Sequence, residues 1–489
     1  MTRTFNTRLV FKTLGALLVI EAVFMAVPTL VSWLYDEPDF HVFCLSAGIT
    51  LITGLVGMLS GIGAERHVGE REGYLIVAVV WLMFSFFGMM PYYLSGAIPS
   101  FTDAYFETIS GFTTTGATIL TDIEQLTHGC LIWRNLTQWL GGMGIIVLSI
   151  AILPMFGLGG MQLYAAEVTG LSYEKLSPRI ADTAKRMWGL YIILTLIEAV
   201  MLWLFGMDAF DSVCHSFSTI ATGGYSTKNL SIAYYDSAAI QYTITFFMFI
   251  SGINFALLYY IILRKPKKLL HDEETHWYMV AVALATTILT FGLIIQSGEW
   301  TWTGSEEAFR KSLFTTIATM TSTGYAVADY TQWHPLMWVI VFFLMFTGAC
   351  AGSTSGGIKW VRLAIFAKNG VAEFKRRIHP NAIIPAKLNG KPISQQTTGN
   401  VMAFMTFYLF VIIISILAFC TLGVNFDESI GATVSAIGNV GPSIGQYGPA
   451  GTYAAFPTAG KWIMAAVMLI GRLEIFTVLL LFSPALWKK

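Results

Sequence analysis

The sequence predicts an all-α polytopic membrane protein, and three observations lead to this fold class. First, the chain of 489 residues is 55% hydrophobic and only 12% charged, whereas a soluble protein carries roughly 25% charged residues. Second, apolar stretches long enough to cross a bilayer recur along the whole chain. Third, four segments between these stretches share one pattern, which indicates an internal repeat.

Ten apolar stretches are predicted to span the membrane, with no soluble domain of ordinary size between them. The first is about 20 residues long, longer than a signal-peptide core, so we expect it to be retained as a helix. The predicted spans are 13–34, 41–62, 74–95, 130–153, 187–207, 237–262, 277–296, 335–350, 401–422 and 460–482.

The positions of the charges orient these helices, although the net charge is zero. If the N-terminus is cytoplasmic, the loops on the inner side hold most of the 29 Lys and Arg residues. Cytoplasmic loops of membrane proteins are enriched in these residues. We therefore expect both termini to be cytoplasmic. The basic residues left on the outer side are Arg134, Lys228, Arg310, Lys311 and Lys461.

Composition excludes several classes of function. No basic domain is present to neutralise phosphates, which argues against nucleic-acid binding. The five cysteines are scattered and the histidines form no metal motif. We find no nucleophile with a base and no P-loop lysine, so we expect no catalytic residue, no bound cofactor and no enzymatic activity. The glycine strings 141–144 and 157–160 lack a βαβ context and are interpreted as sites of close helix packing.

The repeated unit is a span, a short helix, a loop and a second span. Each short helix leads into small, hydroxyl-rich residues around a glycine. Alignment on that glycine pairs Thr115-Gly116, Thr222-Gly223, Thr323-Gly324 and Val440-Gly441. The predicted divisions are an N-terminal two-helix hairpin at 1–70 and pore units at 71–170, 171–270, 271–395 and 396–489.

A loop that enters and leaves the membrane on one side must line a wet cavity enclosed by protein, because lipid cannot satisfy its backbone. Four such loops around one axis place rings of carbonyl oxygens there, and these rings replace the hydration shell of a cation. Glycine permits the backbone angles required, and the C-terminal ends of the short helices favour a cation. The sequence thus predicts four pseudo-symmetric span–pore helix–filter loop–span units around one pore, plus two extra N-terminal transmembrane helices.

The loop sequences GFTTTGAT, TIATGGYS, TSTGYA and NVGPSIG resemble the filters of the Trk/Ktr/HKT superfamily of potassium transporters, most closely its TrkH/TrkG branch. The resemblance covers essentially the whole chain. Glycine at all four aligned positions implies a preference for K⁺ over Na⁺, with Rb⁺ also passing. The filter implied by the resemblance consists of Thr114, Thr115, Gly116, Ala221, Thr222, Gly223, Ser322, Thr323, Gly324, Asn439, Val440 and Gly441.

A glycine- and serine-rich run interrupts the second span of the third unit. Glycine costs about 1 kcal/mol relative to alanine in a helix, so we expect the helix to break there and to face the cavity. A packing patch of small residues is the alternative. The resemblance implies an intramembrane gate made of Gly348, Gly352, Ser353, Thr354, Ser355, Gly356, Gly357 and Lys359.

Arg472 lies inside the last predicted span, where a charge is costly and faces a cavity or a partner. The resemblance implies a positive charge beneath the filter; a buried pair with an acid is the alternative. On a continuous helix, Glu474 would face away from Arg472. Glu21 and Glu198 also fall within spans, and the sequence suggests no role for them.

The resemblance implies channel-like K⁺ uptake across a bacterial inner membrane, with K⁺ as the substrate. Three alternatives remain: secondary transport coupled to H⁺ or Na⁺, a Na⁺-permeable member of the superfamily, and a membrane enzyme. Secondary transport with alternating access predicts inverted repeats, whereas these four units run in one direction.

The resemblance also implies a homodimer on a cytosolic TrkA-like ring that binds the nucleotide and controls the gate. The basic segments 264–268 and 368–391 are candidate docking sites for that ring.

Overall fold

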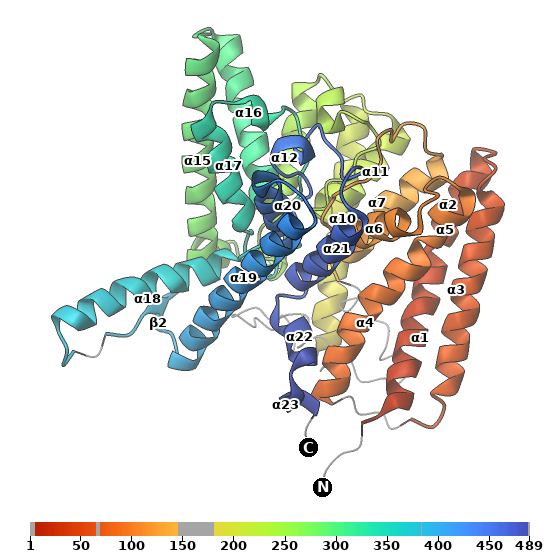
Figure 1. Cartoon of the computed structure of the whole chain (residues 1–489). Helices are drawn as coiled ribbons and strands as arrows, with labels where there is room; N and C mark the ends of the chain where they lie inside the picture. The colour runs from red at the N-terminus through yellow and green to blue at the C-terminus, as the bar shows by residue number, and fades with distance from the viewer. Residues whose placement is uncertain (1–4, 65–68, 145–179, 383, 488–489) are drawn as a thin grey trace.

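The computed structural model describes residues 5–64, 69–144, 180–382 and 384–487. These residues form a helical assembly in which one pattern of elements recurs four times (Figure 1). A long helix leads to a short helix, then to an extended loop, and then to a further helix. The fold class predicted from the sequence is therefore confirmed, whereas the divisions between units stay predictions.

The N-terminal part precedes the first repeat and consists of α1 (Thr7–Phe24), α2 (Ala26–Leu34) and α3 (Phe40–Ser60). The first repeat contains α4 (Glu70–Gly88), α5 (Met90–Ser95), α6 (Phe101–Phe112) and α7 (His128–Gly142). The second contains α10 (Ile180–Leu204), α11 (Ala209–Ile220), η2 (Ser231–Tyr234), α12 (Ala238–Ser251), α13 (Phe255–Ile262) and α14 (Lys267–Leu270).

The third repeat contains α15 (Glu273–Ser297), α16 (Trp302–Met320), η3 (Tyr330–Gln332), α17 (Pro335–Phe346) and α18 (Trp360–Ile378). A hairpin of β1 (Lys387–Leu388) and β2 (Lys391–Pro392) leads to the fourth repeat. That repeat contains α19 (Gln395–Thr421), α20 (Phe426–Gly438), η4 (Gly445–Tyr447), α21 (Thr458–Arg472), α22 (Phe476–Leu479), η5 (Leu480–Phe482) and α23 (Pro484–Trp487).

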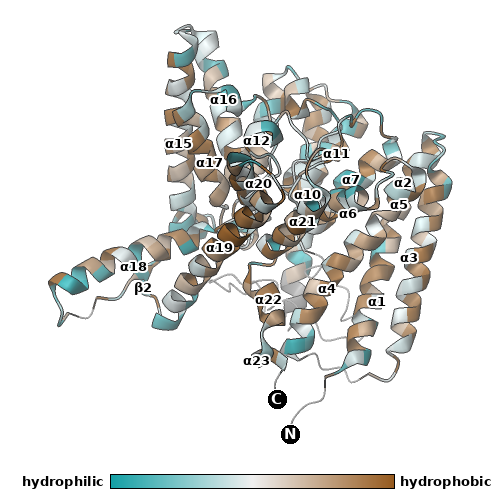
Figure 2. Cartoon of the chain, viewed as in Figure 1, coloured by the Kyte–Doolittle hydropathy of each residue, from teal (hydrophilic) through white to brown (hydrophobic). Residues whose placement is uncertain are grey.

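Six helical segments in the described ranges are long and apolar enough to cross a membrane. Their outer surfaces carry exposed apolar side chains, as expected for contact with lipid. Figure 2 shows that α1, α3 and α4 contain many apolar residues. They correspond to six of the ten predicted spans. The six are Thr7–Leu34, Phe40–Ser60, Arg71–Ser95, Ala184–Leu204, Glu273–Ser297 and Gln395–Thr421.

The other four predicted spans differ from the continuous helices expected. The predicted span 237–262 is bent by 105° between α12 and α13, and the span 460–482 is bent by 113° after α21. The span 335–350 is only the 12-residue helix α17. The span 130–153 begins as α7, and its residues from 145 onward lie outside the described residues.

Hydropathy does not predict these bends, because the backbone N–H and C=O groups that leave the helix there form hydrogen bonds with another part of the chain. At the break between α12 and α13, the amide of Cys350 donates to the carbonyl of Gly252 at 2.9 Å, and the amide of Phe255 donates to the carbonyl of Gly352 at 3.0 Å. The glycine-rich segment of the third repeat thus replaces the missing helical hydrogen bonds of the second. A running average over one segment cannot detect a partner about a hundred residues away.

The helices α6, α11, α16 and α20 bring the chain to the centre of the molecule. Three of them have 12 or 13 residues, whereas α16 has 19 and is longer than the short helix predicted. Three of the four helices begin at a side-chain cap: Ser100 for α6, Asp208 for α11 and Thr301 for α16. Each ends one or two residues before a non-glycine residue with a positive φ. Helix formation stops there because this backbone conformation cannot continue a right-handed helix.

Candidate filter and intramembrane loop

The four loops share one unusual backbone conformation. A non-glycine residue in the left-handed region is followed two residues later by a glycine that also has a positive φ. Left-handed backbone is uncommon for threonine and serine, so its fourfold recurrence indicates one shared structure. The pairs are Thr114 and Gly116, Thr222 and Gly224, Ser322 and Gly324, and Asn439 and Gly441.

Hydrogen bonds set the register of the loops. The residue between the two left-handed positions donates its amide to the preceding short helix: Thr115 to Ser110, Gly223 to Ser218, Thr323 to Ala318 and Val440 to Ser435, at 2.8–2.9 Å. Gly223 is therefore equivalent to Thr115, and Gly224 is equivalent to Gly116.

The sequence alignment of the second loop was consequently wrong by one residue. The equivalent triplet is Thr222-Gly223-Gly224, and Ala221 is the right-handed C-cap residue of α11. The error arose because two glycines are adjacent here and the alignment used the Thr-Gly dipeptide. Backbone angles decide which glycine occupies the special position, and these angles are not visible in the sequence.

The four loops close into a ring around one axis. A Cβ atom on Gly116 would lie 2.2 Å from the carbonyl oxygen of Gly223, and one on Gly224 would lie 1.8 Å from that of Thr323. A Cβ on Gly324 would lie 2.0 Å from the carbonyl oxygen of Val440, and one on Gly441 would lie 2.5 Å from that of Thr115. Each glycine therefore packs directly on a carbonyl of the next loop. Both the positive φ and this close approach require glycine at the four positions.

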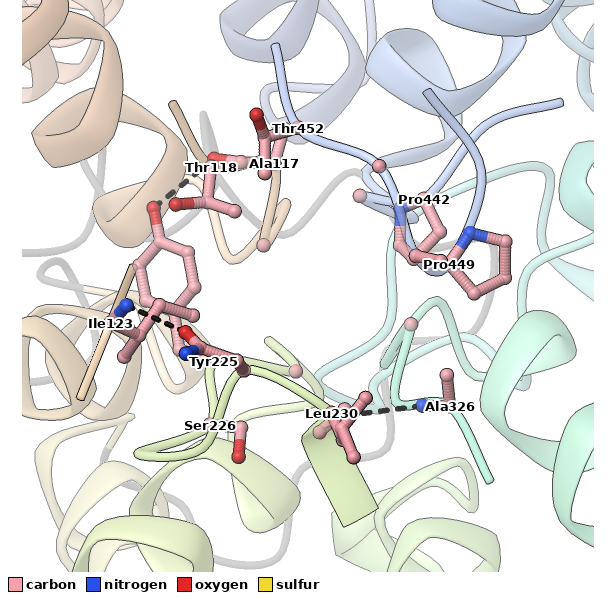
Figure 3. A pocket seen from close by; sticks show the side chains of 18 of the residues that line it. Ala117, Thr118, Ile123, Tyr225, Ser226, Leu230, Ala326, Pro442, Pro449 and Thr452 are labelled. Atoms are coloured by element: carbon pink, nitrogen blue, oxygen red, sulfur yellow. Dashed lines mark hydrogen bonds between the residues drawn. The ribbon is translucent and has the colours of Figure 1, made fainter. Parts of the chain in front are cut away.

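A cavity of about 350 Å³ opens on one side of the ring. Gly116, Gly224, Gly324 and Gly441 all line it, and Figure 3 shows segments of all four loops around its mouth. The loops are joined at this level: the amide of Ile123 donates to Asn229 at 2.7 Å, and that of Ala326 donates to Ser231 at 3.2 Å. The cavity thus gives access to the ring of carbonyls from that side of the molecule.

A carboxylate lies close to this mouth. The side-chain amide of Asn229 donates to Asp122 at 2.9 Å, and this hydrogen bond holds the pKa of the Asp122 carboxyl below its ordinary value. Asp122 is accordingly ionised at neutral pH. A negative charge beside the entrance favours the approach of cations.

A buried ion pair supports the first two loops from behind. The Arg134 Nε lies 2.6 Å from a Glu107 oxygen, and both side chains are almost completely buried. Arg134 also donates to the carbonyl of Ser226 at 2.9 Å and lies 3.5 Å from the ring centre of Tyr225. Glu107 accepts from the amide of Ile119 at 3.0 Å. The pair therefore connects the loop of the first repeat to that of the second.

Two of the basic residues assigned to the outer side are buried. Arg134 is 1% exposed, and Lys461 is 5% exposed and pairs with Asp103 at 2.6 Å. Charge counting predicts a side of the membrane and does not predict burial. Their partners on α6 make burial tolerable, since a buried charge needs an opposite charge and hydrogen bonds.

The glycine- and serine-rich run of the third repeat forms the predicted break. The helix α17 ends at Phe346 and α18 begins at Trp360. We call residues 347–359 the intramembrane loop. The Thr354 hydroxyl donates to the carbonyl of Ile220 at 3.0 Å and accepts from Thr222 at 3.3 Å, while the amide of Gly356 donates to the Ser322 hydroxyl at 2.6 Å. The loop is therefore attached to the second and third loops of the ring, close to the ends of α11 and α16.

Arg472 holds the intramembrane loop from the other side. Its guanidinium donates to the carbonyl of Thr354 at 2.8 Å and to those of Gly141 and Gly142 at 2.5 and 3.0 Å. Lys359 lies at the end of the same loop and donates to the hydroxyl of Ser355 at 3.1 Å. Positive charge is thus concentrated beneath the ring.

The expectation of a continuous helix around Arg472 was wrong. Arg472 is the last residue of α21, and Glu474 and Ile475 have φ values of 55° and 64°. Glu474 forms an ion pair with Arg362 of α18. A helical-wheel argument does not apply to these residues, because the helix has already ended.

Three remaining sequence features can also be placed. Close helix packing is confirmed for the glycine string 141–144: a Cβ on Gly141 would lie 1.9 Å from the carbonyl oxygen of Phe112. The string 157–160 lies outside the described residues. Glu21 and Glu198 are completely buried. The Glu21 carboxylate has no hydrogen-bond partner among the described residues, whereas the Glu198 carboxylate lies near the hydroxyl of Thr219.

Comparison with known proteins decides the family. The family model TrkH, described as a cation transport protein, matches residues 62–489. The chain belongs to the TrkH family. The prediction from the filter sequences is therefore confirmed, and the family's described function, cation transport, is not enzymatic.

The relatives of this TrkH-family chain resemble it over its whole length. It is 37% identical to the Trk system potassium uptake protein TrkH of Halomonas elongata, over 99% of this chain and 100% of that one. It is 36% identical to the protein of the same name from Escherichia coli K12, over 99% of each chain. The crystal structure of the potassium transporter TrkH from Vibrio parahaemolyticus matches with a TM-score of 0.89 at 33% identity, covering 99% of this chain and 100% of that one.

Sequence reasoning missed four residues in or beside the ring of loops. They are Gly224, Glu107, Arg134 and Gln138, whose Nε2 donates to the carbonyl of Gly223 at 2.6 Å. A signal existed for two of them. Arg134 and Gln138 are a charged residue and an amide inside the predicted span 130–153, and polar side chains at that depth face a cavity or a partner. Glu107 on α6 was the available partner for Arg134.

Proposed function

We propose that this TrkH-family chain is the K⁺-translocating membrane subunit of a bacterial Trk-type uptake system. One observation carries the proposal: four loops close into a ring in which each glycine packs on a carbonyl of the next loop. Carbonyl rings bind K⁺ in place of its hydration shell. The names of the relatives, which are potassium uptake proteins, support K⁺ transport as the function.

The proposed path begins at the outer cavity and passes through the ring. A cation enters between the four loops and exchanges water for backbone oxygens of the filter. In the proposal the filter consists of Thr114-Thr115-Gly116, Thr222-Gly223-Gly224, Ser322-Thr323-Gly324 and Asn439-Val440-Gly441. A membrane potential supplies about 2.3 kcal/mol per charge per 100 mV, which draws cations inward without ATP.

We propose that the intramembrane loop is the gate. It lies against the inner ends of the second and third filter loops, and Arg472 connects it to α7. Opening then requires that the loop release Thr222 and Ser322 or that Arg472 release the loop. The positive charge of Arg472 beneath the ring also raises the barrier for a cation when the loop is in place.

Removal of one hydrogen-bonding hydroxyl tests this gate. Thr354→Val keeps the shape of the side chain but removes its bonds to Ile220 and Thr222. We expect K⁺ flux into liposomes to rise about two- to tenfold, because the hydrogen bonds of this hydroxyl favour the attached state. The control is Thr347→Val in the same loop, since among the described residues the Thr347 hydroxyl bonds only to the carbonyl of Leu344, at 2.8 Å. Equal fluxes in the two variants would contradict the gate.

We also propose the cellular setting. The chain resides in a bacterial inner membrane with both termini cytoplasmic, forms a homodimer, and is controlled by a cytosolic TrkA-like ring that binds the nucleotide. The placement of both termini on one side is supported by Figure 1, where the start of α1 and the helix α23 lie at the same end of the molecule. Basic residues of α18, including Lys375, Arg376 and Arg377, occupy the C-terminal turn of that helix.

Cation flux in liposomes holding the purified protein tests the function. We expect K⁺ and Rb⁺ to flow down their own gradients, with Na⁺ much slower. Flux that appears only when an H⁺ or Na⁺ gradient is imposed would instead support coupled secondary transport. Equal K⁺ and Na⁺ fluxes would support a Na⁺-permeable member of the superfamily.

A further inference from the structure

The second position of the filter triplet is supported differently in each loop. In the first loop the Thr115 hydroxyl bonds to Thr113 at 2.8 Å and accepts from Asn439 at 3.0 Å. In the third, the Thr323 hydroxyl bonds to Thr321 at 2.7 Å. In the fourth, Val440 is buried in an apolar cluster. The second loop has Gly223 at this position and therefore has no side chain with which to anchor itself.

The side chain of Gln138 occupies the space that this missing side chain would fill. Gln138 belongs to α7 and is completely buried. A Cβ on Gly223 would lie 2.4 Å from the Gln138 Cδ, 2.5 Å from Oε1 and 2.8 Å from Nε2. The backbone of Gly223 is not in the left-handed region. The position of Gln138, not the backbone angle, is what excludes a side chain at residue 223.

Both ends of the Gln138 amide hold the filter backbone. The Nε2 atom donates to the carbonyl of Gly223 at 2.6 Å, and Oε1 accepts from the amide of Tyr225 at 3.0 Å. The Gly223 carbonyl is one of the four that pack on a glycine of the adjacent loop. In the part of the chain that the structure describes, the equivalent carbonyls of Thr115, Thr323 and Val440 accept no side-chain hydrogen bond.

We propose that Gln138 is a positioning residue of the filter: its amide substitutes for the side chain that the second loop lacks and fixes the Gly223 carbonyl in the ring. The inference rests on the proposed function. Adjacent glycines have the greatest backbone freedom of any dipeptide, so Gly223 and Gly224 form the part of the ring that most needs external support. Selectivity for K⁺ thereby depends on a side chain outside the filter loops.

The test measures the K⁺/Na⁺ permeability ratio of the full-length protein in liposomes. Gln138→Leu keeps the approximate volume and removes both hydrogen bonds. We expect the ratio to fall about tenfold, because the freed carbonyl no longer holds its place in the ring. The matched control is Asn135→Leu on the same helix. Asn135 is also a completely buried amide, but it bonds to Ser218 and Leu131 rather than to a filter residue. We expect this control to keep the ratio within about twofold of wild type.

A compensating pair makes the test independent of a general loss of stability. Gly223→Thr alone should lower the ratio, because the new side chain displaces the Gln138 amide. Gln138→Ala vacates that space, so Gly223→Thr with Gln138→Ala should recover most of the wild-type ratio, with threonine at residue 223 as at Thr115 and Thr323. If the single variants do not fold, recovery of folded, selective protein in the double variant supports the proposal by itself.

The failures are distinguishable. If the wild type is selective and Gln138→Leu keeps the wild-type ratio, the inference is overturned while the proposed function stands. A double variant no better than the poorer single variant also overturns it. Absence of selective cation flux in the wild type would overturn the proposed function, and this inference with it.

Discussion

Serine in place of Gly224 is expected to abolish most of the discrimination between K⁺ and Na⁺. Gly224 has a φ of 78°, and a Cβ would lie 1.8 Å from the carbonyl oxygen of Thr323. A side chain at this φ costs of order 1–3 kcal/mol, and the contact forces that carbonyl out of the ring. We expect the K⁺/Na⁺ flux ratio in liposomes to fall at least about tenfold. The same argument applies to Gly116, whose Cβ would lie 2.2 Å from the Gly223 carbonyl.

The control for this prediction separates backbone strain from displacement of the filter. Gly96 has a nearly identical φ of 75°, but nothing lies within 4 Å of a Cβ built there. Gly96→Ser therefore imposes the same strain outside the filter and should leave the flux ratio unchanged. If Gly96→Ser and Gly224→Ser lower the ratio equally, the effect is not due to the ring. If Gly224→Ser keeps the wild-type ratio, the register that places Gly224 opposite Thr323 is wrong.

Replacement of Glu107 by glutamine is expected to cause a large loss of stability. The substitution leaves the Arg134 charge buried without its counter-charge, and breaking a buried pair in this way costs about 3–5 kcal/mol. Arg134 also supports Tyr225 and Ser226 beside the second filter loop. We therefore expect both a lower unfolding temperature in detergent and a loss of selective K⁺ flux.

Two variants show whether the buried pair itself is responsible. Glu373→Gln removes the partner of Arg376 on the surface of α18, where both side chains are exposed, and should change stability by no more than about 1 kcal/mol. The double variant Glu107→Leu with Arg134→Met removes both charges and should regain much of the stability lost in Glu107→Gln. A Glu107→Gln protein as stable as the wild type would show that the pair contributes little.

Local properties of the sequence were sufficient for the class of the protein and for much of its fold. Low charge content and apolar stretches predicted a polytopic membrane protein, and six of the ten predicted spans are long, apolar helices. The helix break before Gly348 was also predicted, because a run of glycine and serine is intrinsically unfavourable in a helix. The resemblance of the filter sequences predicted the family. Each of these inferences depends on composition or on contiguous residues.

Tertiary structure decided which glycine of the Gly223-Gly224 pair belongs to the ring, where α12 and α21 end in bends, and which buried groups pair. The physical reason is the same in each case: the deciding partner is distant in sequence. Gln138 holds the carbonyl of a residue 85 positions away, and Arg472 donates to one 331 positions away. A propensity or a hydropathy average depends only on the residues of one contiguous segment. Only the folded chain shows which carbonyl needs a donor and which side chain supplies it.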